Sequence, residues 1–153
     1  MASQHKVVGS PAMSVVRTTK TLRAVFTPYM VEIGLRPPGP LVFAALAERD
    51  GLTQTEIADV CGSDAPSVTK CLRGLEGLGL VRRERDTEDT RVQRVFLTPE
   101  GKELAPRLDV AWQQASSEFF EPLTAAERTQ LAALLDKIFE YHRARRPEPA
   151  VIT

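Results

Sequence analysis

The stretch LTQTEIADVCGSDAPSVTKCLRGLEGLGLVRRERDTEDTRVQRVFLT, residues 52–98, carries most of the information about the fold. Its last part, residues 82–98, starts with mostly charged or polar residues of both signs and ends in the alternating run RVQRVFLT. Alternation of polar and apolar residues is typical of a half-buried strand, and a polar cluster between two strands is typical of a turn. The stretch therefore predicts two strands, residues 80–85 and 91–97, joined by the polar turn DTEDT.

Two short helices precede this ribbon in the sequence. Thr53 and Glu56 have the spacing of a capping box, which predicts a helix over residues 53–61. Asp64 is placed to cap a second helix over residues 64–78, and proline is tolerated in a first turn. Apolar residues at i, i+3, i+4 and i+7 predict the inward face of this second helix, which consists of Val68, Cys71, Leu72 and Leu75.

Helical patterns also flank this central stretch on both sides. Residues 14–34 have apolar residues loosely at helical spacing, and we expect Pro28 to kink or reset that helix. A short buried helix follows near residues 41–46. Thr98 is placed to cap a long helix, and Thr124 begins a second capping box before the last helix.

These elements predict a mainly α fold with a small β-wing, namely a winged helix-turn-helix with a helical dimerisation region. The apolar stripes of residues 104–119 and 131–139 exceed what one small winged domain can cover, which favours a homodimer. The predicted division is an N-terminal dimerisation segment, a winged helix-turn-helix DNA-binding domain, C-terminal dimerisation helices and a flexible tail, at residues 1–36, 37–98, 99–146 and 147–153.

Composition bounds the protein class without deciding the function. A chain of 153 residues with 42% hydrophobic and 26% charged residues suits one domain with an extension. The formal net charge is zero, so DNA binding has to rest on the local placement of basic residues. We see no signal peptide and no apolar stretch long enough for a bilayer, so we expect a cytoplasmic protein with no membrane partner.

The pattern of helices and strands predicts binding to double-stranded DNA. A major groove about 12 Å wide admits one helix, and the preceding helix braces it across a tight turn. The wing would then reach the neighbouring minor groove or the phosphate backbone. From these two elements we select as candidate DNA contacts Pro66, Ser67, Thr69, Lys70, Arg73, Arg85 and Arg94.

The motifs "LE-x-x-GLV-x-R", an acidic wing tip ending in D-x-R, and "LT-x-x-G" follow the two helices in order. Over residues 35–108 this arrangement resembles the MarR family of bacterial transcriptional regulators. The resemblance implies a homodimeric repressor that binds a pseudopalindromic operator and responds to a small aromatic or anionic molecule, or to oxidants. It also matches Arg91 to the arginine that enters the minor groove, with Asp89 as its orienting partner. The chain departs from the family at Thr90, where a second arginine is common, and at Pro66.

Residues outside the central stretch suggest where an effector would bind. Arg17 and Arg23 on the first helix are candidates for holding an anionic ligand, and Trp112 is a candidate for a pocket wall. The alternatives are that the arginines are solvated or contact phosphates, and that Trp112 is a packing residue. Cys61 and Cys71 lie at inward positions, which leaves a cysteine-based redox sensor as a further alternative.

Other function classes find little support in the sequence. No nucleophile-and-base constellation, phosphate-binding glycine loop or cluster of metal ligands is present, so we predict no enzyme activity, no cofactor and no metal site. A winged-helix module that binds a protein rather than DNA stays open as an alternative.

Overall fold

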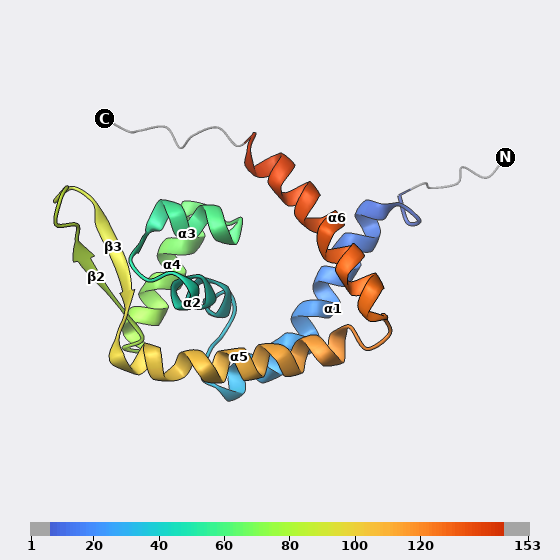
Figure 1. Ribbon diagram of the computed structural model, residues 1–153, viewed down its shortest axis with the longest axis horizontal. Helices are drawn as coiled ribbons and strands as arrows, with labels where there is room; N and C mark the ends of the chain where they lie inside the picture. Colours follow the sequence, from blue (N-terminus) through green and yellow to red (C-terminus); the bar gives the residue numbers. More distant parts are fainter. Residues whose placement is uncertain (1–6, 146–153) are drawn as a thin grey trace.

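The computed structural model describes residues 7–145, which form six helices and a small three-stranded sheet. The sheet lies at one end of the molecule, away from the first and last helices (Figure 1). The predicted fold class, mainly α with a small β-wing, is confirmed. The predicted tail, residues 147–153, lies outside the described residues. In chain order the elements are α1 Pro11–Glu32, α2 Gly39–Glu48, β1 Leu52–Thr53, α3 Gln54–Cys61, α4 Ala65–Gly77, β2 Val81–Arg85, β3 Gln93–Leu97, α5 Pro99–Phe119 and α6 Ala125–Arg143.

The two central helices begin and end where local side-chain chemistry dictates. At the start of α3 the Thr53 hydroxyl accepts the Glu56 N–H at 3.2 Å, and the Glu56 carboxylate accepts the Thr53 N–H at 2.8 Å. This confirms the predicted capping box. Gly62 ends α3 in the left-handed conformation with φ of 63°. Asp64 then caps α4 by accepting the Ser67 N–H at 2.7 Å, as predicted.

The wing is the β2–β3 part of an antiparallel sheet with the strand order β1-β3-β2. Val81 pairs with Leu97 at the base of the ribbon, and Arg85 pairs with Gln93 near its tip. The two-residue strand β1, which adds Leu52 opposite Val95, was not predicted from the sequence. Two residues are too few to show an alternation of polar and apolar side chains, so this strand is recognised only by its pairing with β3.

The core lies where α2, α3, α4, β3 and α5 meet. Its most deeply buried side chains include Leu35, Phe43, Leu46, Ile57 and Leu72, each 0% exposed. The predicted inward face of α4 is buried, with Val68, Cys71, Leu72 and Leu75 all in the core. Val95 and Leu97 of β3 are also buried, which attaches the wing firmly to this lobe.

Helix α1 packs along α5 beneath the central lobe (Figure 1). The ring of Phe26 meets the ring of Trp112 edge-on at a centroid distance of 4.9 Å. Of the two expected effects of Pro28, a kink or a reset of the helix, the reset is wrong, because α1 continues through Pro28 to Glu32. Packing against α5 holds the chain helical through the proline, and the Thr27 hydroxyl donates to the Arg23 carbonyl oxygen at 2.7 Å in the preceding turn.

Helix α6 turns back from the end of α5 and reaches the central lobe only near its own C-terminus (Figure 1). None of its residues is buried, although Leu134, Leu135 and Ile138 are large and apolar. Near its end, Arg143 Nη1 lies 2.7 Å from the Asp59 carboxylate of α3. A Cβ atom at Gly62 would lie 2.8 Å from the ring of Phe139, so α6 also contacts the end of α3 through this ring.

Candidate DNA-binding surface

Helix α4 presents its polar face to solvent because its apolar face is held in the core. The exposed positions include four of the candidate DNA contacts, namely Pro66, Ser67, Lys70 and Arg73. The Asp64 cap fixes the first turn, in which Pro66 and Ser67 lie. Two of these side chains are cationic, so this face can donate hydrogen bonds both to phosphates and to base edges.

Thr69 differs from the other candidates on α4 because it is half-buried against α3. The Gln54 side-chain amide donates to the Thr69 hydroxyl and, at 3.2 Å, to the Ala65 carbonyl oxygen. The Thr69 hydroxyl donates in turn to the Ala65 carbonyl oxygen at 2.9 Å. These bonds fix the angle between α3 and α4, so the structure gives Thr69 a part in holding the two helices together.

The wing tip is folded around the carboxylate of Asp86. One of its oxygens accepts the N–H groups of Glu88 at 2.8 Å and of Asp89 at 3.0 Å. The backbone closes the tip, since the Asp86 N–H donates to Val92 O at 2.9 Å and the Val92 N–H donates to Asp89 O at 2.9 Å. The tip is therefore a hydrogen-bonded turn rather than a loose loop.

Asp89 holds the side chain of Arg91 in a two-point contact, as expected from the sequence. Arg91 Nε lies 3.0 Å from one carboxylate oxygen of Asp89, and Nη2 lies 3.2 Å from the other. The Arg91 backbone N–H donates to the same carboxylate at 3.0 Å. These bonds lower the pKa of Asp89, so it stays ionised at neutral pH. The Arg91 side chain is nevertheless 89% exposed. Asp89 therefore holds one edge of the guanidinium and leaves most of the group open to solvent.

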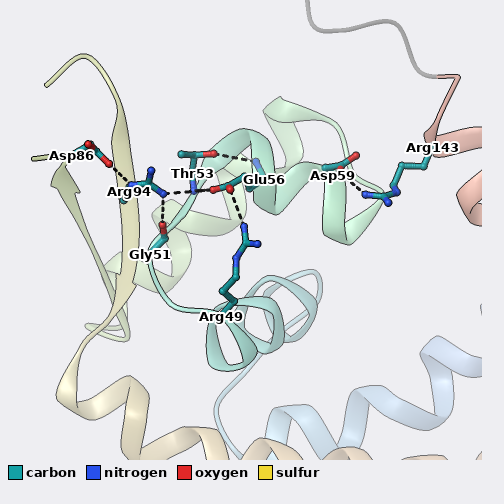
Figure 2. Close-up of polar contacts among 8 residues, drawn as sticks. All are labelled: Arg49, Gly51, Thr53, Glu56, Asp59, Asp86, Arg94 and Arg143. Atoms are coloured by element: carbon teal, nitrogen blue, oxygen red, sulfur yellow. Dashed lines mark hydrogen bonds and ion pairs between the residues drawn. The ribbon is translucent and has the colours of Figure 1, made fainter. Parts of the chain in front are cut away.

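The remaining wing candidates, Arg85 and Arg94, have different surroundings. Arg85 is exposed at the end of β2. Arg94 points inward, and its guanidinium donates to the Asp86 carboxylate and, at 3.0 Å, to the Gly51 carbonyl oxygen (Figure 2). Its sequence position on the wing predicts a DNA contact, and the structure engages two of its donor nitrogens within the protein while 39% of the side chain stays exposed.

Sequence reasoning missed three polar residues that organise this surface, namely Gln54, Glu56 and Asp86, of which Glu56 was assigned only a capping role. An aspartate that precedes a polar turn commonly accepts the N–H groups two and three residues later, and this local signal could have identified Asp86. No local signal identifies Gln54, since its partner lies 15 residues away.

The three candidate ligand-binding residues do not all lie at one site in the structure. Arg23 and Trp112 line the same cavity of about 340 Å³, together with Phe26, Met30 and Leu41. Its walls come from α1, the segment between α1 and α2, the start of α2, α5 and Phe120. Arg17 is exposed and is not among the lining residues. The structure therefore brings together two of the three predicted ligand residues, in a mostly apolar cavity with one cationic side chain.

The two cysteines lack the surroundings of reactive thiols. Burial raises the pKa of Cys71 to about 11, and it also raises the pKa of Cys61. The Cys61 thiol donates to the Leu41 carbonyl oxygen, with sulfur and oxygen 3.7 Å apart. A reactive cysteine needs a lowered pKa, so these environments argue against redox sensing.

The fold and the surface together define a winged helix-turn-helix protein. A family model described as the MarR family matches residues 33–92. The transcriptional regulator HosA of Escherichia coli O157:H7 is 30% identical over 104 residues, which cover 68% of this chain and 77% of HosA. The chain belongs to the MarR family of DNA-binding transcriptional regulators. Other curated relatives that it matches are also named as transcriptional regulators, among them TtmR of Methylorubrum extorquens.

Solved structures agree with this fold. The regulator PcaV from Streptomyces coelicolor, in complex with its natural ligand, aligns with a TM-score of 0.81 at 24% identity and covers 92% of this chain and 98% of its own. The transcriptional repressor CouR, bound to a 23-mer DNA duplex, aligns with a TM-score of 0.79 at 24% identity, covering 90% of this chain and 98% of its own. Across residues 7–145, no helix combines the length and apolar character needed to cross a membrane.

Proposed function

We propose that this protein is a repressor that binds a pseudopalindromic operator as a homodimer and leaves it when a small aromatic or anionic ligand binds. The observation that carries the DNA-binding part is the exposed guanidinium of Arg91, held at two points by Asp89 at the tip of a ribbon. A guanidinium presented in this way suits a narrow minor groove, where the negative potential is enhanced. The CouR structure, a repressor bound to a DNA duplex, supports the same reading.

The homodimer follows from apolar surface that the single chain leaves open. Leu134, Leu135 and Ile138 on α6 are 53%, 44% and 56% exposed, and Val15 and Val16 on α1 are 48% and 52% exposed. Several large apolar side chains left exposed on two helices are the kind of surface that a protein interface would cover. In this proposal residues 1–36 and 99–146 form the dimerisation region, and residues 37–98 form the DNA-binding domain. The dimer would hold two α4 helices about 34 Å apart, one turn of the double helix.

Ligand release rests on the cavity that Arg23 and Trp112 line. It lies between α1 and α5 of the dimerisation region and the start of α2 in the DNA-binding domain. An aromatic carboxylate would fit such a site, with its ring on the apolar wall and its charge near Arg23. A ligand there would change how the two regions pack, and so the separation of the α4 helices. The ligand complex of PcaV is a precedent for a ligand-binding regulator of this fold.

The test measures binding of the protein to DNA from its own upstream region by fluorescence anisotropy. Arg91→Ala should weaken binding by about 1–3 kcal/mol without lowering the melting temperature, because the side chain is exposed. Asp89→Ala should also weaken binding although it removes a negative charge, because Arg91 loses its orientation. Arg107→Ala on α5 removes one exposed positive charge outside the wing and serves as the control.

The same titration separates this proposal from a winged-helix module that binds a protein. Phosphate contacts release counterions, so operator binding should weaken steeply as salt rises. Arg91→Ala binding like the parent protein would show that the wing is not a DNA element. A cytoplasmic location is part of the proposal, since the operator is there.

A further inference from the structure

We propose that Arg94 is a positioning residue, which fixes the wing on the helix-turn-helix so that Arg91 reaches DNA, and is not itself a DNA contact. This inference rests on the proposed function, because it assigns the way in which one wing residue serves operator binding. From the sequence Arg94 is predicted to contact DNA directly, whereas here it acts on DNA binding only through the position of the wing.

The guanidinium of Arg94 joins two separate segments, the wing tip and the segment that precedes α3. Its Nε–H donates to the Asp86 carboxylate at the wing tip. Its Nη1 donates to the Gly51 carbonyl oxygen at 3.0 Å, and the same nitrogen lies 3.9 Å from the Glu56 carboxylate. Figure 2 shows Arg94 between these partners, with the wing on one side and the start of α3 on the other.

A chain of contacts leads from Arg94 outward to Arg91. Asp86 is the most enclosed carboxylate of the wing tip, with 13% of its side chain exposed. The bond from Arg94 orients this carboxylate, and its other oxygen holds the N–H groups of Glu88 and Asp89. Asp89 in turn orients Arg91. Each contact in this path fixes the group that makes the next one.

Other contacts lead from Arg94 inward to α4, the helix proposed to enter the major groove. The Gly51 N–H donates to Val95 O at 3.0 Å, so the segment that accepts from Arg94 is itself bound to β3. Glu56 caps α3 and also accepts from Arg49 at 2.8 Å. Gln54, in the first turn of α3, bonds to Thr69 of α4. These contacts connect the wing tip to α4 and so fix its position relative to that helix.

A positioning residue and a phosphate contact make different predictions in a double-mutant cycle. Arg94→Gln should weaken operator binding about tenfold in the parent protein. In the Arg91→Ala background the same change should cost less than about twofold, because the group that Arg94 positions is gone. In the Arg73→Ala background its cost should stay about tenfold, because α4 binds DNA independently. Full cost in both backgrounds would overturn the proposal.

A second readout needs no DNA. Hydrogen bonds from Arg94 and from the amides of Asp89 and Glu88 lower the pKa of Asp86 to about 2, from an ordinary 3.8. The Asp86 carboxyl carbon, followed by NMR, should therefore shift little between about pH 5 and pH 3. In Arg94→Gln the pKa of Asp86 should rise toward its ordinary value, because the largest of the lowering contacts is lost, and the amides of Glu88 and Asp89 should exchange faster. A parent protein whose Asp86 titrates near 3.8 would overturn the proposal.

Asp86→Asn provides a second variant in case Arg94→Gln does not fold. It removes the carboxylate charge from the other side of the same contact, so it should show the same dependence on Arg91. Failure of the proposed function has a distinct signature, in which the parent protein binds no operator and Arg91→Ala changes nothing. Failure of this inference alone leaves parent binding intact and makes the costs of Arg94→Gln and Arg91→Ala multiply.

Discussion

Gly101→Ala should destabilise the protein severely, although alanine is normally the better helix former. Gly101 lies in the first turn of α5, where the helix passes close to the backbone of Leu80. A Cβ atom at this position would lie 2.2 Å from the Leu80 carbonyl oxygen and 3.3 Å from Leu97 Cδ2. Cβ atoms essentially never come within 3.0 Å of a non-bonded heavy atom of another residue. The contact of 2.2 Å therefore requires α5 and the segment before β2 to separate by about 0.8 Å.

The magnitude follows from what this separation disrupts. Overpacking of a tight contact costs about 1–3 kcal/mol. Two bonds also join these segments, from the Thr98 N–H to Leu80 O at 3.0 Å and from the Thr98 hydroxyl to Gly79 O at 2.6 Å. Their weakening adds about 0.5–1.5 kcal/mol each, and the better helix propensity of alanine offsets about 1 kcal/mol. The expected loss in the free energy of unfolding is therefore about 1–5 kcal/mol.

Urea denaturation followed by circular dichroism measures this loss, at one fixed protein concentration because the proposed dimerisation would contribute to stability. Gly74→Ala is the matched control, since Gly74 is also helical but a Cβ atom there meets nothing within 4 Å. It should raise stability by about 0.5–1 kcal/mol. Equal stabilities for the two variants would refute the reasoning, because the approach of α5 to Leu80 would then not be tight.

The remaining predictions concern the dimer, the thiols and the cavity. Ile138→Asp should convert the proposed dimer to a folded monomer in sedimentation experiments, because Ile138 is 56% exposed and would pack in the interface rather than in the core; a dimer of unchanged strength would contradict this. Cys71, with a pKa of about 11, should react with a disulfide reagent at neutral pH far more slowly in the native protein than in urea; equal rates would revive the redox alternative. Arg23→Ala should remove the thermal stabilisation produced by an aromatic carboxylate, whereas Arg17→Ala should preserve it, since only Arg23 lines the cavity; the reverse pattern would place the ligand elsewhere.

Local signals in the sequence predicted the elements of the central lobe. The capping box at Thr53, the Asp64 cap and the alternation in β3 each involve residues within a few positions of one another. The apolar stripe of α4 likewise predicted its buried face. Such signals depend only on residues close together in the sequence, so they can be interpreted before the fold is known.

Long-range contacts could not be predicted in this way. Arg94 and Gly51 are 43 residues apart, and only the pairing of β1 with β3 brings them together. The continuation of α1 through Pro28 depends on its packing along α5. Thr69 looks outward by helical spacing, yet Gln54 from α3 covers it. In each case tertiary contact overrides the local preference, and the sequence alone does not show the partner.

The contact between Gly62 and Phe139 also constrains how the sequence can evolve. Gly62 meets two demands at once, because its φ of 63° disfavours a side chain and the Phe139 ring occupies the space a Cβ atom would need. A larger residue at position 62 would require both a change of backbone conformation and a displaced or smaller residue 139. Phe139 lies on α6, among the apolar residues proposed for dimerisation. Substitutions at the end of α3 and on the proposed dimerisation surface of α6 are therefore expected to occur together among relatives.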